Sequence, residues 1–295
     1  DILEELSNDE LFNLINLFKN DGEKHLHIYL YLNIYYIWKI KLEKFDEIEY
    51  QEISDKCKIR VYKHRNGNLE LNRTFFAMTG EKDYAILYFT VEQSQKELKE
   101  CFAKTKRINW NAGPMFVLVE NQFLDIFYEN VKLSKANIEF EVHSGFFWMN
   151  SKEEVLNFQF EIPDDVILEP LKIEDAPLIV SLWPHKYPEA ERFITSMIKL
   201  NGGYGIYSKS NGNILSWIIK NEYWGIGLLQ TISAECGKGY AKILIKKLCK
   251  DIVENDDNIP SCYIVDKNTK SCALFSKFHF YRVFSCHWLK ILREN

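Results

Sequence analysis

The stretch that decides the fold is Ala234-Glu235-Cys236-Gly237-Lys238-Gly239-Tyr240-Ala241. It follows an apolar run at residues 223–232 that is typical of a strand, and it opens a segment whose periodicity predicts a helix to about Val253. The first amides of a helix have no partner within it, and the helix dipole adds about half a positive charge there. Glycines let a phosphate approach the backbone closely. The stretch therefore predicts an anion site.

Five lysines lie in or just after this turn: Lys238, Lys242, Lys246, Lys247 and Lys250. Lys242, Lys246 and Lys250 share one face of the predicted helix, because residues four apart are neighbours on a helix. A polyphosphate ligand fits this charge, and a glycine-started helix with a solvated lysine face is the alternative. The turn is too short for a P-loop, and it lacks the third glycine of a dinucleotide-binding turn.

The chain around this turn predicts alternating strands and helices. Ser210-Asn211-Gly212-Asn213 is a strong hairpin signal between two strand candidates. In the second half, strands are expected at residues 166–171, 205–208, 214–220, 262–265 and 283–291, and helices at 174–183, 188–200 and 268–278. In the first half, helices are expected at 8–18 and 92–103, and strands at 84–91 and 116–119. The fold class is α/β, with a mixed α+β sheet.

Proline usage divides the chain. Only Pro114 precedes residue 163, whereas Pro163 and five further prolines follow. This shift predicts two domains, residues 1–162 and 163–295. The first half shows no catalytic constellation. His25 and His27 would share a face if they lay on a strand, but no third ligand stands at a telling distance, so we expect no metal.

Composition excludes several classes of protein. Of 295 residues, 46% are hydrophobic and 27% charged, which rules out a disordered chain, and the net charge of −5 argues against a dedicated nucleic-acid binder. The apolar run at residues 28–38 is too short to span a bilayer, so we expect a buried strand or helix and no membrane partner. Seven cysteines without a Cys-x-x-Cys pair favour a reducing compartment. No export signal is visible, although the sequence does not begin with Met.

The glycine turn resembles the Arg/Gln-x-x-Gly-x-Gly/Ala turn of the GNAT acyltransferase superfamily, which holds the pyrophosphate of coenzyme A. Ala234 stands at the Arg/Gln position, and Cys236 stands where many members carry a second Arg. About 30 residues on, Asn268-x-x-Ser271-x-x-Leu274-Phe275 is similar to the helix that packs beside the pantetheine in this superfamily. The resemblance implies a GNAT fold in the second half.

Within the superfamily, the second half is most similar to the glycine N-acyltransferase-like proteins. The resemblance covers residues 166 to about 291, and the matches fall in the family's order and spacing: Leu182-Trp183, Glu191-Arg192-Phe193-Ile194 and Leu215-Ser216-Trp217. Members of that family carry a divergent amino-terminal half with a GNAT-like layout, in agreement with a split near residue 162.

The resemblance implies transfer of an acyl group from acyl-coenzyme A to the amine of a small acceptor, often glycine or another amino acid. In the family, pantetheine pairs with the edge of a strand that separates from its neighbour. The residues that would bind coenzyme A are Leu228, Leu229, Gln230, Glu235, Cys236, Gly237, Lys238, Gly239, Tyr240, Ala241, Asn268, Ser271 and Phe275.

Two positions depart from the pattern. The glutamate base of the glycine-conjugating members aligns with Gly225, whereas Glu222, three residues earlier, would act as the base through a water after a small shift. Phe275 replaces the tyrosine that often protonates the departing thiolate, and a phenylalanine has no proton to donate. Cys236, at a helix start, is a candidate nucleophile or simply a small residue in a tight turn.

The leading expectation is therefore an N-acyltransferase that works by direct attack on acyl-coenzyme A, without a metal. The alternative is a non-catalytic acyl-coenzyme A binder or interaction protein that kept the turn and lost the base and acid. A histone or protein acetyltransferase would need an open acidic groove. The expected location is intracellular, cytoplasmic by default, with the mitochondrion as the alternative that the family resemblance offers.

Overall fold

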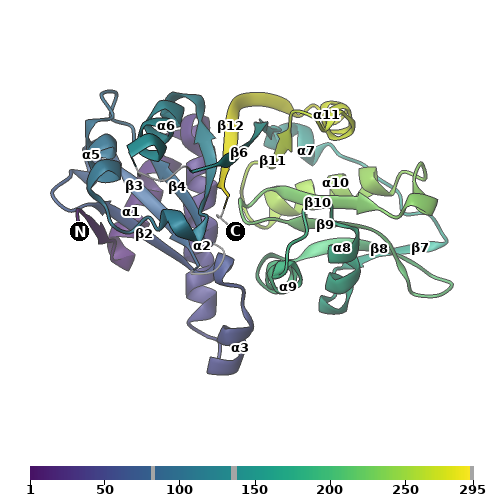
Figure 1. The fold of residues 1–295 in the computed structure, drawn as a ribbon. Helices are drawn as coiled ribbons and strands as arrows, with labels where there is room; N and C mark the ends of the chain where they lie inside the picture. The colour runs from purple at the N-terminus through teal and green to yellow at the C-terminus, as the bar shows by residue number, and fades with distance from the viewer. Residues whose placement is uncertain (81–83, 134–137, 293–295) are drawn as a thin grey trace. The chain divides into compact units, whose positions relative to one another are not determined.

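A computed structural model describes the chain except residues 81–83, 134–137 and 293–295 (Figure 1). Its contacts divide it into unit 1 (residues 1–44, 55–145 and 284–295) and unit 2 (residues 45–54 and 146–283). The division falls within two strands, β6 (Phe140–Met149) and β12 (Tyr281–Ile291). The predicted junction at residue 162 lies in unit 2, between α7 (Lys152–Leu156) and β7 (Val166–Pro170), and stays a prediction.

Unit 1 is a mixed sheet with helices between its strands. Its strands follow the order β1-β2-β3-β4-β5-β12, with antiparallel neighbours except for the parallel pair β4–β5. The elements are β1 (Leu3–Glu5), α1 (Asn8–Lys19), α2 (Leu26–Leu42), β2 (Ile59–His64), α4 (Leu69–Asn72), β3 (Phe75–Thr79), β4 (Ala85–Phe89), α5 (Lys96–Lys104), β5 (Met115–Glu120) and α6 (Leu124–Leu133).

The predicted elements of the first half are present. Ser7 caps α1, and Glu10 completes a capping box with it. The apolar run at residues 28–38 lies in the buried helix α2. His25 and His27 do not share a strand face, because His25 ends a 3₁₀ turn and His27 lies in the first turn of α2.

From β7 onward, unit 2 repeats this order of elements, except that no helix in its described residues matches α4. Its strand order is β6-β11-β10-β9-β8-β7, with one parallel pair, β10–β11, among antiparallel neighbours along β7 to β10. The remaining elements are α3 (Glu47–Glu52), α8 (Ala176–Leu182), α9 (Ala190–Asn201), β8 (Gly203–Ser208), β9 (Ile214–Lys220), β10 (Ile226–Thr231), α10 (Tyr240–Glu254), β11 (Ser261–Val265) and α11 (Thr269–Ser276).

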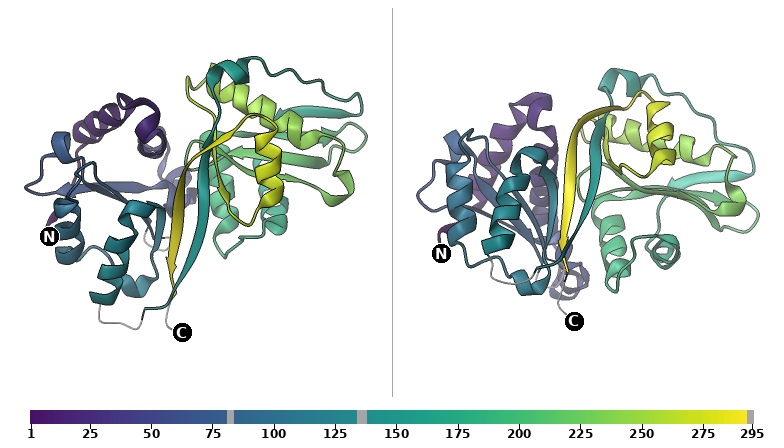
Figure 2. Two further views of the ribbon diagram at one scale, coloured as in Figure 1. Left: turned by 90° about the horizontal axis from the view of Figure 1, so that it is seen from above. Right: turned by 45° about the horizontal axis from the view of Figure 1, so that its top comes forward.

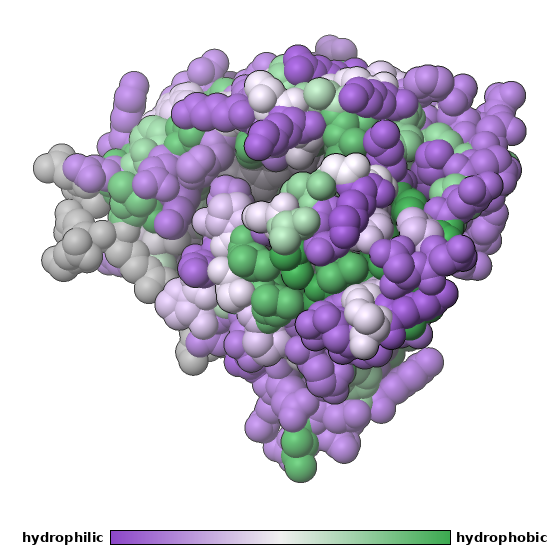
Figure 3. All heavy atoms as spheres, turned by 90° about the vertical axis from the view of Figure 1, so that its right-hand side faces the viewer, coloured by the Kyte–Doolittle hydropathy of each residue, from purple (hydrophilic) through white to green (hydrophobic). Residues whose placement is uncertain are grey.

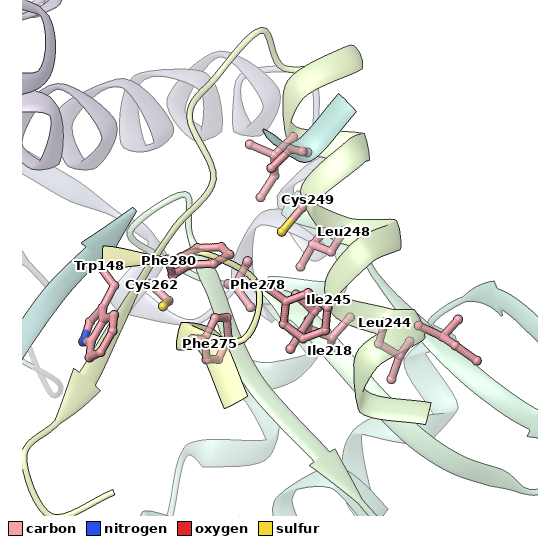
Figure 4. Packing of buried hydrophobic residues seen from close by; sticks show 14 of the residues in the cluster. Trp148, Ile218, Leu244, Ile245, Leu248, Cys249, Cys262, Phe275, Phe278 and Phe280 are labelled. Carbon is pink, nitrogen blue, oxygen red and sulfur yellow. The ribbon is translucent and has the colours of Figure 1, made fainter. Parts of the chain in front are cut away.

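Two layers of helices enclose the sheet of unit 2. Helices α10 and α11 lie on one face of it, and α8 and α9 lie on the other (Figures 1 and 2). Helix α10 buries an apolar stripe that includes Leu244, Ile245 and Leu248, spaced as one helix face requires. This stripe packs against Ile218 of β9 and Cys262 of β11 (Figure 4). The packing fixes the end of α10 that bears the glycine turn.

Candidate functional site

The parallel strands β10 and β11 separate soon after they begin. Their register contains one partner pair, Ile226 with Cys262. On the other side of β10, the register with β9 shifts between Gly227 and Gln230, and Leu228 in the shifted segment has a φ of 48°. The extra residue makes a β-bulge, which bends the strand away from its neighbour. Ile226 is buried, whereas residues 227–231 are all partly exposed. The result is an open strand edge, as the resemblance implies.

The glycine turn has the backbone that the sequence requires. Gly237 has a φ of 88° and Gly239 a φ of 87°, values that strain any residue with a side chain. A Cβ atom at either position would meet no atom within 4 Å, so the space above both glycines is open. Gly239 is the N-cap of α10, and no side-chain hydrogen bond caps this helix within the described residues. The first amides of α10 are thus available to an anion.

The lysines around the turn do not all converge on it. Lys238 pairs with Glu235 at 2.7 Å. Lys246 and Lys250, which share a helix face as predicted, donate instead to the backbone carbonyls of Gln159 and Phe158, at 2.6 and 3.4 Å. The Nζ of Lys247 lies 4.7 Å from the ring centre of Tyr204. Exposed Lys242 is left in the first turn of α10, where it adds positive charge near the open amides. Two of the five lysines therefore fix the preceding linker, and they do not contact the turn.

The other predicted ligands divide between the open edge, the turn and the core. Leu228, Leu229 and Gln230 lie on the open edge, and the side chain of Gln230 donates to the carbonyl of Leu182 at 3.2 Å. Residues 235–239 form the turn, Tyr240 is buried at 2% exposure, and Ala241 is partly buried. Exposed Cys236 has its Sγ 3.6 Å from the carbonyl oxygen of Ile232, and no described cysteine is disulfide-bonded.

Helix α11 presents a cap and a core residue. Asn268 is its N-cap, and its side-chain oxygen accepts from the amide of Ser271 at 3.1 Å. Phe275 is 4% exposed and packs edge-on against Phe280, with ring centres 5.1 Å apart, in the cluster beneath α10 (Figure 4). Asn268 therefore has a structural role whether or not a ligand is bound, and Phe275 belongs to the hydrophobic core.

Glu222 lies in the turn that leads into β10. The side-chain oxygen of Asn221 accepts from the amides of Tyr223 and Gly225, at 3.1 and 3.0 Å, which fixes the turn, and Glu222 is partly exposed. A Cβ at Gly225 would lie 2.8 Å from the carbonyl oxygen of Ser261. A glutamate therefore does not fit at position 225 without a backbone shift, and Glu222 remains the carboxylate nearest in sequence to the start of β10.

A buried charge network, which no local sequence pattern indicates, anchors the same turn. Lys220 is 7% exposed and bonds Asp256 at 2.5 Å, and the indole of Trp224 donates to the same carboxylate at 2.9 Å. Asp256 follows α10, far from β9 in sequence, so only the fold brings the three together. A buried lysine is retained only when paired in this way.

The surface near the glycine turn is polar. A hollow of about 380 Å³ adjoins it, lined among others by Asp165, Ser208, Asn211, Glu235 and Lys238. Figure 3 shows one face of the molecule, on which a hydrophobic area is bordered by hydrophilic side chains. Within the described residues, no group of three His, Cys, Asp or Glu side chains could hold a metal ion. No helix in the described part of the chain is long and apolar enough to cross a membrane.

Comparison with known proteins bears on the fold. The family described as FR47-like protein matches residues 203–289, and a domain of unknown function, DUF5645, matches residues 2–130. A search of curated proteins found no match. The chain is similar in structure to a Drosophila protein solved by X-ray crystallography, with 22% identity, full coverage of both chains and a TM-score of 0.92.

Two further solved structures share the fold over nearly the whole chain. A tandem GNAT protein from the clavulanic acid biosynthesis pathway is 8% identical, with 99% of both chains covered and a TM-score of 0.56. A GCN5-related N-acetyltransferase from Sphaerobacter thermophilus is 9% identical, with 100% of this chain and 96% of that chain covered, also at a TM-score of 0.56. The chain therefore has the GNAT-superfamily acetyltransferase fold.

Proposed function

We propose that unit 2 is an acyl-coenzyme A-dependent N-acyltransferase of the glycine N-acyltransferase-like type, which acts on a small amine such as glycine or another amino acid. The observation that carries the proposal is the open edge of β10, where the strand bulges at Leu228 and parts from β11 after a single residue pair. An extended pantetheine would lie along this edge as an added strand does.

The glycine turn would bind the pyrophosphate. The open amides at the start of α10 lie where β10 ends, so one ligand can reach both the turn and the open edge. Residues 235–241 would contact the phosphates, residues 228–230 the pantetheine, and Asn268 and Ser271 its far side, whereas the ring of Phe275 lies in the core.

The chemistry needs a base and an oxyanion site. An ammonium ion cannot attack a thioester, so Glu222 would remove a proton from the amine, directly or through a water. The nitrogen then bonds to the thioester carbon, and a backbone amide at Leu228 or Leu229 would stabilise the oxyanion. Collapse of this intermediate breaks the carbon–sulfur bond; the nitrogen loses its second proton to solvent, the sulfur takes up one proton from solvent, and coenzyme A leaves as the free thiol.

The test combines calorimetry with an assay. The purified full chain should bind coenzyme A by titration calorimetry and release free thiol when acyl-coenzyme A and a panel of amino acids and small amines are added. Glu222→Gln should reduce turnover about 100-fold, the typical share of a general base, with coenzyme A affinity unchanged. Glu254→Gln, at an exposed residue of α10, is the control and should behave as the wild type. Full activity in Glu222→Gln would exclude Glu222 as the base.

A second candidate function is a non-catalytic acyl-coenzyme A binder. Two observations favour it: position 225 has no room for a glutamate, and Phe275 is a core residue without a proton to donate. Binding of coenzyme A without acylation of any amine in the panel would establish the binder in place of the enzyme.

A further inference from the structure

Three side chains of unit 1 form a hydrogen-bonded series that the acyl transfer proposed for unit 2 does not use. The hydroxyl of Ser144, on β6, lies 2.9 Å from Nδ1 of His287, on β12. Nε2 of the same imidazole lies 2.6 Å from the side-chain oxygen of Asn121, directly after β5. His287 is 143 residues from Ser144 and 166 from Asn121. No local pattern indicates such a series, and for this reason the sequence predicts no catalytic group in the first half.

The partners of the imidazole decide where its proton lies. An amide oxygen can only accept a hydrogen bond, so Nε2 of His287 carries the proton of the neutral ring and donates to Asn121. Nδ1 is then unprotonated and accepts from the hydroxyl of Ser144. A hydroxyl that donates to a base, with the base oriented by a third group, is the arrangement of an activated nucleophile. Ser144 therefore has its proton acceptor in place.

Solvent reaches all three side chains, and the strand beside them is irregular. Asn121 is exposed, and Ser144 and His287 are partly exposed. Directly after His287, the register between β12 and β5 shifts, and Leu118 in the shifted segment of β5 has a φ of 56°. Such β-bulges re-aim side chains and are frequent beside active sites. Both features are expected of a reactive site rather than of a buried structural hydrogen bond.

A hollow of about 480 Å³ adjoins the start of β6, with Tyr128, Lys132 and Phe140 among its lining residues. Alternate residues of a strand share a face, so Phe140, Val142 and Ser144 follow one another along one face of β6. A strand rises about 3.3 Å per residue, which places Phe140 about 13 Å from Ser144. Val142 between them is 43% exposed. An apolar chain would therefore lie along this face, from the hydroxyl to the hollow.

We propose that unit 1 carries an esterase site, in which Ser144 is the nucleophile, His287 the base and Asn121 the positioning residue, and that its substrates are esters of apolar acyl chains. This site goes beyond the function proposed for unit 2 and does not depend on it.

The reaction consumes only the ester and water. The oxygen of Ser144 bonds to the ester carbon as its proton passes to Nδ1 of His287. The carbon–oxygen bond to the alcohol then breaks, and the alcohol leaves with that proton. Water next gives a proton to Nδ1 as it attacks the acyl-serine. The bond to Ser144 breaks, the proton returns to its oxygen, and the carboxylic acid leaves.

A fluorophosphonate tests the nucleophile in the full chain. This reagent reacts with activated serines: a phosphorus–oxygen bond forms, the phosphorus–fluorine bond breaks, and the base takes the proton. Mass spectrometry of the peptides should find an adduct at Ser144. Ser210, an exposed serine whose hydroxyl lies 2.8 Å from that of Ser208, is the internal control and should stay unmodified. Absence of the adduct at Ser144, or equal labelling of Ser210, would overturn the inference.

Variants test the base and the positioning residue. His287→Gln should slow both the labelling and the hydrolysis of p-nitrophenyl octanoate about 100-fold, the typical share of a general base. His143→Gln, at an exposed histidine next to Ser144 on β6, is the matched control and should react as the wild type. Asn121→Leu should slow both reactions about 10-fold, whereas Asn121→Asp should speed them up, because a carboxylate stabilises the imidazolium.

Each outcome decides the inference. Equal rates in the wild type and His287→Gln would overturn it. If His287→Gln does not fold, the two variants at exposed Asn121 decide instead, and equal rates in both would overturn it. The octanoate should react at least about 10-fold faster than p-nitrophenyl acetate, because only the longer chain reaches along Val142, and equal rates would overturn the substrate class. None of these results bears on coenzyme A binding by unit 2, which calorimetry measures separately.

Discussion

Units 1 and 2 have the same element order but differ at the strand edge. In unit 1, β4 pairs in parallel with β5 over two residue pairs, and in unit 2, β10 pairs in parallel with β11 over one. In unit 1 all of β4 except Ala85 is buried. In unit 2 all of β10 except Ile226 is partly exposed. One layout therefore gives a filled core in unit 1 and an open edge in unit 2.

The turn between β4 and α5 is also filled, whereas the turn between β10 and α10 is open. In unit 1, the carboxylate of Glu92 accepts from the amide of Glu97 at 2.9 Å and from the hydroxyl of Ser94 at 2.5 Å. An acidic side chain thus occupies the start of α5, where unit 2 has two glycines and open amides. A helix start attracts negative charge, and unit 1 supplies that charge itself.

Aromatic rings complete the filling of unit 1. Phe89, the last residue of β4, has Phe18 at 5.6 Å and Phe123 at 5.4 Å between ring centres, both edge-on. Nearby, buried His27 lies 3.0 Å from the carboxylate of Glu120. Shared architecture therefore does not imply a shared site, because a site also needs an unfilled edge and an uncapped helix.

The largest expected effect is a loss of coenzyme A affinity when the glycine turn is changed. Gly239→Glu should lower coenzyme A affinity about 1,000-fold, or about 4 kcal/mol, because it strains a φ of 87° and places negative charge at the proposed phosphate site. Gln95→Glu makes the matched change at the N-cap of α5 and should leave affinity unaltered. Titration calorimetry measures both. Equal affinity in Gly239→Glu and wild type would remove the turn from the site.

A second substitution tests the start of the open strand. Gly225→Glu should reduce the free energy of unfolding by about 3 kcal/mol, because its Cβ would lie 2.8 Å from the backbone oxygen of Ser261 and its carboxylate would enter a buried position. Gly225→Ala, which adds only the Cβ, should cost about half as much. In unit 1 the matching position before β4 is Tyr84, whose hydroxyl donates to the carbonyl of Arg107 at 2.6 Å. Urea unfolding checks the ranking, and a stable, more active Gly225→Glu would contradict it.

The sequence predicted most elements of unit 2 and some of those in unit 1. Strand β9 has the predicted bounds, and the predicted turn and helix of α10 are confirmed, because their signals are local: a hairpin glycine, two turn glycines and an apolar stripe. Strand β3 was not predicted, because Phe75–Thr79 is buried throughout and shows no alternation. Helix α5 begins at Lys96 rather than near residue 92, since Glu92 caps its start instead of lying in it.

The site was harder to predict than the fold. The glycine turn follows from adjacent residues, whereas the bulge at Leu228 depends on how β10 meets β9 and β11. The contact between Gly225 and Ser261 joins residues 36 positions apart, so no local pattern indicates it. The lysine spacing correctly predicted a shared helix face, but it did not indicate that Lys246 and Lys250 bind the linker.

A smaller expected effect is a pH dependence of stability that comes from buried His27 in unit 1. Burial lowers the pKa of His27 below 6.5, although Glu120 opposes the shift. Below pH 6.5, His27 therefore binds a proton in the unfolded chain but stays neutral in the folded chain. The free energy of unfolding should fall as the pH drops from 7 toward 5. His27→Gln keeps a donor for Glu120 and should flatten this slope. His143→Gln, at an exposed histidine of β6, should not.

The smallest expected effect concerns Glu92, whose carboxylate binds an amide at the start of α5. Glu92→Ala should reduce the free energy of unfolding by about 0.5–1 kcal/mol, since it removes one helix-start hydrogen bond. Uncapping α5 should nevertheless create no second coenzyme A site, because β4 remains buried beneath its aromatic neighbours. Calorimetry should therefore give one bound coenzyme A per chain in the variant, as in the wild type. A second bound equivalent would mean that the helix start alone, without an open strand edge, is sufficient for binding.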